Sequence, residues 1–278
     1  MKTVISASRR TDMPACYLGH LIGFIRRGFA EAANPWSGQV TRVELAPESV
    51  HTLVLWSKNF APFLRRSREF NAYRLYFLFT VNDMPDMEPS LPSLGRRLDQ
   101  VRELAERYGP ESIGWRFDPV VFRADGPLAP METYLRIGER MAEYGVKRSI
   151  FSFLDLYGKV KARNERFSLG IIDPPYEVKR EYAESIASAA RTLGMRLESC
   201  SESLGPIEGI APSACIDGAL FSRLSGEPAS LAKDPGQRPA CRCTESRDIG
   251  SYRSMRCPHG CLYCYANPLI RTGGRSAG

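Results

Sequence analysis

The chain has 278 residues, a formal net charge of +7 and a hydrophobic fraction of 43%. This length can bury a sizeable core and fits a single (β/α) barrel, which commonly has roughly 250 residues. The sequence has no apolar run near the ~18 residues of a membrane span and no signal-peptide h-region, so we expect a cytoplasmic protein with no membrane partner.

Short apolar segments alternate with segments of helical periodicity along the chain. The predicted strands are residues 3–7, 52–56, 75–81, 113–122, 149–154 and 196–200. The predicted helices are residues 14–27, 60–69, 94–108, 131–144 and 176–193, and residues 30–45 are predicted to form a loop or hairpin. This alternating order predicts a mostly parallel sheet with helices outside it. We interpret it as a complete or partial (β/α) barrel, with an open doubly wound sheet as the alternative.

The composition changes after residue 203, where Gly, Pro, Ser and Cys become frequent. We therefore predict a barrel body over residues 1–203. Residues 204–278 are predicted to form a cysteine-rich metal-binding segment that packs on the barrel and completes it as one structural unit.

The last part of this segment contains the spacing C-x3-C-x2-C, formed by Cys257, Cys261 and Cys264. Three such thiolates can hold three irons of a [4Fe–4S] cluster and leave the fourth iron without a protein ligand. Gly260 lets the backbone bend tightly around the cluster. The alternative is a zinc site, which His259 or Cys243 could complete as a fourth ligand.

The same spacing, with Tyr263 as an aromatic residue before the third cysteine, resembles the signature of the radical S-adenosylmethionine superfamily. The resemblance implies that Cys257, Cys261 and Cys264 bind the cluster and that its open iron binds S-adenosylmethionine. Reduction would then give a 5′-deoxyadenosyl radical that takes a hydrogen atom from the substrate. It also implies that Tyr263 lies beside the adenine, and that an electron donor such as flavodoxin or ferredoxin is a partner.

The motif usually follows the first barrel strand in that superfamily, near the N-terminus, whereas here it comes late in the chain. The resemblance therefore implies a circularly permuted barrel. Residues 247–252 would form a strand beside residues 3–7, and residues 262–270 would begin the next helix. The chain also resembles an uncharacterised bacterial family, a domain of unknown function, through the runs ISASRRTD, WRFDP and ACID and the cysteine cluster.

Four further cysteines lie between residues 200 and 243: Cys200, Cys215, Cys241 and Cys243. Four thiols are enough to ligate a second cluster completely. The alternatives are a zinc ion in the same place and buried thiols that act as small hydrophobic residues.

Barrel enzymes collect their chemistry at the carboxyl ends of strands. On this basis the predicted catalytic residues are Arg10, Arg116, Asp118 and Asp155, and Arg9 and Lys58 are predicted to bind the cofactor. For any one of them the structural alternative is an internal ion pair, such as Arg116 with Asp118. Asp12 could likewise cap a helix. Cys16, His20, His51 and His259 are expected to be structural or surface residues.

These patterns predict an iron–sulfur protein that is a radical S-adenosylmethionine enzyme. The basic charge, and a C-Y-C-Y-A-N stretch similar to that of DNA-photoproduct-repair members, favour nucleic acid as a partner or substrate. The alternative is a non-enzymatic nucleic-acid-binding module that zinc or a cluster stabilises.

Overall fold

An eight-stranded sheet forms the centre of the computed structural model, which describes residues 2–270. All of its neighbouring strands pair in parallel. Across the sheet the strands are β12 (Ile210–Pro212), β11 (Arg196–Ser199), β9 (Arg148–Phe153), β6 (Ile113–Val120), β5 (Leu75–Thr80), β4 (Val50–Ser57), β1 (Thr3–Ala7) and β13 (Arg247–Asp248). The expected mostly parallel sheet is confirmed. Within residues 2–270 the edge strands β12 and β13 do not pair with each other, so no closed barrel forms.

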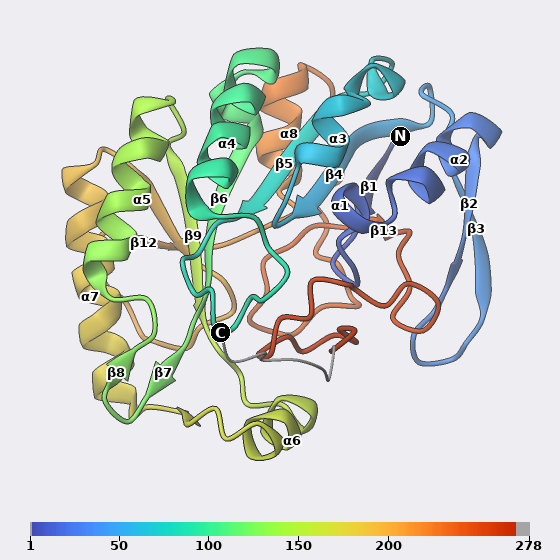
Figure 1. Cartoon of the computed structure of the whole chain (residues 1–278). Coiled ribbons are helices and arrows are strands. Elements are labelled where there is room, and N and C mark those ends of the chain that lie inside the picture. The colour runs from blue at the N-terminus through green and yellow to red at the C-terminus, as the bar shows by residue number, and fades with distance from the viewer. Residues whose placement is uncertain (1, 271–278) are drawn as a thin grey trace.

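One face of the sheet is covered by the helices that connect consecutive strands (Figure 1). They are α1 (Met13–Cys16), α2 (Leu18–Arg27), α3 (Ala61–Arg65), α4 (Leu94–Tyr108), α5 (Met131–Glu143) and α7 (Tyr176–Thr192). Their apolar stripes pack on the strand residues that point toward them. For example, Val101 of α4 and Ile137 of α5 share one core with Phe77. This packing explains why helical periodicity located these segments. The helix predicted over residues 14–27 is divided into α1 and α2 at Tyr17, and the one predicted over residues 60–69 ends at Arg65 and is followed by a 3-10 turn.

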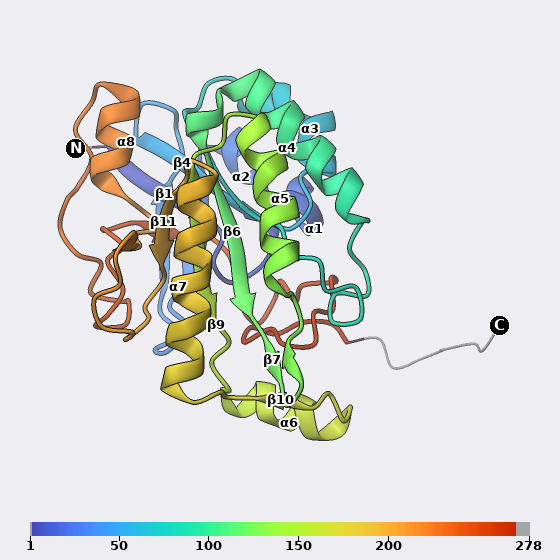
Figure 2. The same cartoon turned by 90° about the vertical axis from the view of Figure 1, so that its left-hand side faces the viewer.

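The other face of the sheet is covered by α8 (Gly218–Ser225), which lies on the far side of the strands from α4 and α5 (Figure 2). Alternate strand residues, among them Val54 and Tyr76, form a second apolar cluster with this helix. The ring of Phe221 lies 5.1 Å from that of Tyr76. Because both faces are buried, the strands are continuous apolar runs in the sequence.

The remaining elements are short and lie around the sheet. They are the hairpin β2 (Phe29–Ala33) and β3 (Val40–Glu44), the small sheet β7 (Phe122–Arg123), β8 (Gly126–Pro127) and β10 (Ile171–Ile172), the helix α6 (Gly158–Arg166), and the 3-10 turns η1 (Ser67–Phe70) and η2 (Pro110–Ser112). The predicted hairpin over residues 30–45 is confirmed, whereas α6, α8 and β12 were not predicted.

Strand β13 lies where the permuted barrel requires it, beside β1, with Ser6 opposite Asp248. It is shorter than the predicted strand over residues 247–252. The helix predicted over residues 262–270 is wrong, because these residues form turns whose amides bond to other segments. Leu262 N donates to the Met87 carbonyl at 2.9 Å, and Leu269 N donates to that of Cys257 at 2.8 Å. Residues 271–278 of the predicted metal-binding segment lie outside the described residues.

Candidate metal and cofactor site

The three cysteines of the C-x3-C-x2-C motif lie on a loop that follows β13 and crosses the carboxyl end of the sheet (Figure 1). Gly260 has a φ of 66°, and a Cβ there would lie 3.0 Å from the Leu269 carbonyl oxygen. This backbone conformation favours glycine and produces the tight bend between Cys257 and Cys261. Arg163 of α6 fixes the other half of the loop. Its Nε donates to the Leu262 carbonyl at 2.8 Å, and its Nη2 donates to that of Cys264.

The three thiols lie in one largely buried environment. Burial raises the pKa of Cys261 well above its ordinary value, an effect that Lys58 opposes and Glu88, Cys264 and Cys257 increase. In contrast, a hydrogen bond from Cys16 lowers the pKa of Cys257 to about 7. A thiol of low pKa is a good metal ligand because more of it is thiolate at neutral pH.

A second group shares Cys257 with the motif. Cys16, Cys257 and His259 place one ligand atom each within 4.8 Å of one another, and they could hold a metal ion. Cys16 is the last residue of α1, and its Sγ lies 3.7 Å from His259 Nε2. Sequence reasoning missed this group, because Cys16 has no metal-ligand spacing to any nearby residue. Only the parallel packing of β1 beside β13 brings it to the motif.

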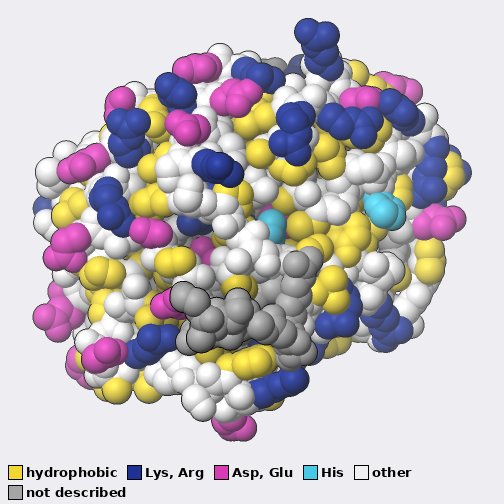
Figure 3. Space-filling view, in the orientation of Figure 1, with side chains coloured by type: hydrophobic (Ala, Val, Ile, Leu, Met, Phe, Trp, Pro, Cys, Tyr) yellow, Lys and Arg dark blue, Asp and Glu magenta, His cyan; other side chains and the backbone are white. Residues whose placement is uncertain are grey.

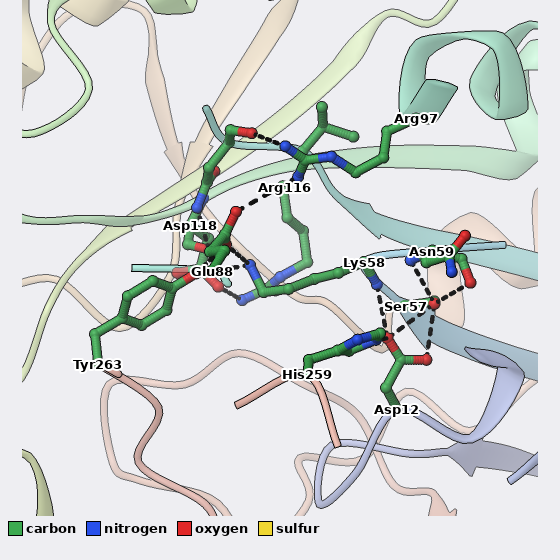
Figure 4. Close-up of polar contacts among 12 residues, drawn as sticks. Asp12, Ser57, Lys58, Asn59, Glu88, Arg97, Arg116, Asp118, His259 and Tyr263 are labelled. Atoms are coloured by element: carbon green, nitrogen blue, oxygen red, sulfur yellow. Dashed lines mark hydrogen bonds and ion pairs between the residues drawn. The ribbon is translucent and has the colours of Figure 1, made fainter. Parts of the chain in front are cut away.

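Asp12 organises the surroundings of His259 (Figure 4). Its carboxylate accepts hydrogen bonds from His259 Nε2 at 2.9 Å and from the Lys58 amide at 2.8 Å. It also accepts from Ser57 Oγ, and from the Ala15 amide as the expected helix cap. Although burial lowers the pKa of His259, Asp12 raises it above its ordinary value. The imidazole is therefore held in one orientation beside Cys257.

Lys58, Glu88 and Tyr263 form a compact polar cluster beside the motif (Figure 4). Lys58 Nζ donates to Glu88 Oε1 at 2.7 Å and to Tyr263 Oη at 2.8 Å. The Tyr263 hydroxyl donates to the same carboxylate oxygen, and Arg97 Nη1 lies 3.5 Å from Glu88 Oε2. Glu88 and Tyr263 are only 3% and 4% exposed. The structure thus brings together Lys58 and Tyr263, both predicted to bind the cofactor, and adds Glu88, which was not predicted.

Arg116 and Asp118 form an ion pair late in β6, which is the structural alternative to the catalytic roles predicted for them, and those roles stay predictions. Arg116 Nη1 also donates to Cys215 Sγ at 2.6 Å, so this side chain lies at the other cysteine set. Burial lowers the pKa of Arg9, but its neighbours raise the pKa above the ordinary value, and Cys243 contributes most to this increase. Arg9, predicted to bind the cofactor, therefore lies against that set as well.

Arg10 and Asp155 make contacts at the rim of the site. Arg10 Nη1 donates to the carbonyls of Ala33 and Gly250 at 3.0 and 3.1 Å, and so links β1 to the loop after β13. Asp155 is exposed and pairs with Arg238 at 2.6 Å. Their catalytic roles stay predictions.

The surface was expected to attract nucleic acid. Figure 3 shows basic side chains spread over the face drawn there, with acidic side chains between them. Such a mixed surface identifies no partner. None of the helices in residues 2–270 is long and apolar enough to cross a membrane.

An open parallel α/β sheet with cysteine loops at the carboxyl ends of its strands defines the class of this protein. The chain belongs to the family described as "Domain of unknown function (DUF1848)", which matches residues 4–266. No curated protein matches the chain.

Two solved structures share only a weak likeness to this one. A D-hydantoinase is 12% identical, with a TM-score of 0.34. The match covers 72% of this chain and 42% of the D-hydantoinase chain. A protein described as an alpha-L-fucosidase from Bacteroides thetaiotaomicron VPI-5482 is 13% identical, with a TM-score of 0.28 over 84% of this chain and 91% of that one. Neither likeness carries an argument about activity.

Proposed function

We propose that this protein is a radical S-adenosylmethionine enzyme, in which Cys257, Cys261 and Cys264 bind a [4Fe–4S] cluster. S-adenosylmethionine would bind at the iron that the three thiolates leave open. When bound, the cluster supplies the electron for reductive cleavage of S-adenosylmethionine, which starts hydrogen abstraction from a substrate.

The observation that carries this proposal is the place of the motif in the sheet. In the radical S-adenosylmethionine superfamily, which the motif resembles, the cluster loop follows the first strand of the barrel. Here the loop follows β13, which pairs in parallel with β1 at the edge of the sheet. From β13 onward the strands follow in the order β1, β4, β5, β6 and β9, as a circular permutation requires.

The side chains around the motif fit a cluster. Three thiols on one tightly bent, largely buried loop are suitable donors for three irons. Lys58 is a cation close enough to lower the pKa of Cys261, although burial raises that pKa more. The positive charge of Lys58 would also stabilise a cluster of net negative charge.

Lys58, Glu88 and Tyr263 would form the floor of the cofactor site. Their mutual hydrogen bonds fix the Tyr263 ring, which the resemblance puts beside the adenine. The Lys58 ammonium would bind the carboxylate of S-adenosylmethionine. The Leu262 amide donates to the Met87 carbonyl at 2.9 Å, which ties the cysteine loop to the segment after β5.

Two partners follow from this proposal. An electron donor such as flavodoxin or ferredoxin is required to reduce the cluster. Nucleic acid is the substrate class that the net charge of +7 favours.

The test is cofactor cleavage by the 278-residue chain. It is reconstituted anaerobically with iron and sulfide, reduced with dithionite and mixed with S-adenosylmethionine, and 5′-deoxyadenosine is measured by chromatography. The wild type is expected to form it, and Cys261→Ala is expected to form none and to lose iron. Cys16→Ala is the matched control, because it removes a nearby thiol outside the motif. A fully loaded wild-type cluster that releases no 5′-deoxyadenosine would overturn the proposal.

A second candidate function is favoured by the group of Cys16, Cys257 and His259, whose donors suit zinc. The protein would then be a zinc-stabilised, non-enzymatic nucleic-acid-binding module. This zinc site requires His259 Nε2 to leave Asp12, to which it donates at 2.9 Å. Zinc without iron in protein purified anaerobically would favour this second function.

A further inference from the structure

Four cysteines outside the C-x3-C-x2-C motif gather at a separate place at the carboxyl end of the sheet. Cys200 directly follows β11, Cys215 follows β12, and Cys241 and Cys243 lie in the loop before β13. The Sγ atoms of Cys200 and Cys215 are 3.9 Å apart. Cys215 also contacts Cys243, which in turn contacts Cys241. Three separate segments of the chain therefore supply four neighbouring thiols.

Two arginines lie against these thiols. Arg116 Nη1 donates to Cys215 Sγ at 2.6 Å, and the guanidinium of Arg9 lies beside Cys243. Both guanidiniums also stack near Trp56, with their Cζ atoms 5.2 and 5.6 Å from its ring centroid. Each arginine also has a carboxylate partner, which is Asp118 for Arg116 and Asp234 for Arg9. The guanidiniums face the thiols with the N–H groups that these carboxylates leave, and such donors would also stabilise thiolates or a cluster of net negative charge.

Two buried donors at the same place have no partner among residues 2–270. They are Nη2 of Arg9 and Nε1 of Trp56. Buried N–H groups are almost always hydrogen-bonded, so each orphaned donor needs an acceptor. The inorganic sulfides of an iron–sulfur cluster accept such hydrogen bonds.

One pair of the four thiols is as close as two ligands of a zinc site, because the Sγ atoms of Cys200 and Cys215 are 3.9 Å apart, but the four thiols are not gathered around one point. With Zn–S bonds of ~2.3 Å, tetrahedral geometry places each pair of sulfurs ~3.8 Å apart. In the part of the chain that the structure describes, Cys16, Cys257 and His259 are the one group of three donors that lie mutually within 4.8 Å. No three of the four thiols do so. The four thiols therefore form an open row and not the compact set that surrounds a single ion. A polynuclear cluster is larger than one ion and would separate the closest pair, Cys200 and Cys215.

We propose that Cys200, Cys215, Cys241 and Cys243 are the four ligands of a second iron–sulfur cluster, and that Arg9 and Trp56 donate to its sulfides. This site goes beyond the proposed function, because all of its irons would have protein ligands. It would therefore transfer electrons and would not bind S-adenosylmethionine.

The experiment isolates the second site by removing the first. The combined variant Cys257→Ala, Cys261→Ala and Cys264→Ala is reconstituted anaerobically with ferrous iron and sulfide. It is expected to retain about four irons and four sulfides per chain, with broad absorbance near ~400 nm. The wild type should hold about twice as much iron, and further replacement of Cys200 and Cys215 by Ala should remove the rest.

Each result bears on the second cluster separately from the proposed function. A triple variant that folds, as judged by circular dichroism, and binds zinc or no metal would overturn the second cluster. If the variant without Cys200 and Cys215 does not fold, Cys241→Ser is added to the triple variant instead. An absorbance spectrum near ~400 nm that this substitution leaves unchanged would exclude Cys241 as a ligand. Cofactor cleavage by the wild type tests only the first site, so either proposal can fail alone.

Discussion

Cys16 Sγ lies 3.7 Å from His259 Nε2, although 243 positions separate the two residues in the chain. The contact joins the end of α1 to the cysteine motif. Cys16 can distinguish the two candidate functions, because it belongs to the possible zinc site of Cys16, Cys257 and His259 but not to the C-x3-C-x2-C motif.

Cys16→Ala is therefore expected to keep its iron and its cleavage of S-adenosylmethionine. The reason is that the three motif thiols suffice for the cluster. Iron and zinc analysis of the purified variant, together with 5′-deoxyadenosine formation, checks this. Loss of metal from Cys16→Ala alone would instead identify Cys16 as a ligand.

Lys58→Met is expected to destabilise the fold by about 1–3 kcal/mol, because it removes the closest cation of the buried Glu88 carboxylate and leaves only Arg97 and Tyr263 beside it. The side chain of Glu88 is 1% exposed, and Lys58 Nζ lies 2.7 Å from it. Urea unfolding of the apoprotein measures the effect.

The matched double variant Lys58→Met with Glu88→Gln should recover part of this loss, because the buried negative charge is gone. If the double variant is as unstable as the sum of the two single variants, the pair is not coupled as described.

Gly260→Ala is expected to lower the iron content of the first site. At a φ of 66° an alanine costs roughly 1–2 kcal/mol, and its Cβ would press on the Leu269 carbonyl at 3.0 Å. Iron per chain after limited reconstitution measures the effect. Gly23→Ala is the control, because a Cβ in that part of α2 meets nothing within 4 Å. Equal iron in both variants would contradict a role for the bend.

Trp56→Phe is expected to lower the reduction potential of the proposed second cluster without changing its iron content. The substitution keeps an aromatic ring but removes the unpartnered Nε1–H, and lost hydrogen bonds to sulfur make a cluster harder to reduce. Potentiometric titration followed by electron paramagnetic resonance, in the variant that lacks the first-site cysteines, measures this. An unchanged potential would show that this donor does not reach the cluster.

Glu227→Gln is expected to lower the urea midpoint at pH 7, and the difference from wild type should shrink as the pH falls. Hydrogen bonds from Arg74 and Lys2 lower the pKa of Glu227 to about 2. A lowered pKa stabilises the fold above the ordinary pKa of a glutamate, and this contribution disappears as the pH falls toward about 2. Added salt should also reduce the difference at pH 7, since both ion pairs are exposed. A difference that is equal at pH 7 and pH 3 would exclude this ion-pair effect.

The periodic parts of the fold could be predicted from the sequence. The bounds predicted for α4 match those of the structure, because its apolar residues repeat at helical spacing and face the sheet. The short helix α8 was missed, although Asp217 caps its start and Gly226 ends it. These two cap residues were the available signal, but eight residues are too few for a clear period.

The candidate site could be predicted where its residues are close in sequence or directly follow a predicted strand. The motif spacing located Cys257, Cys261 and Cys264, and strand ends located Lys58. Glu88, in the loop after β5, gave no comparable signal. Its role depends on the tertiary contact of that loop with Tyr263.

The order of the strands also has a consequence for how the protein matures. All eight strands precede Cys257 in the chain, as do Lys58, Glu88 and Arg163, which contact the cysteine loop. The ribosome therefore synthesises the segments that contact the cysteine loop before it synthesises the three proposed metal ligands. A metal bound by these cysteines would connect the segment made last to strands and loops made much earlier.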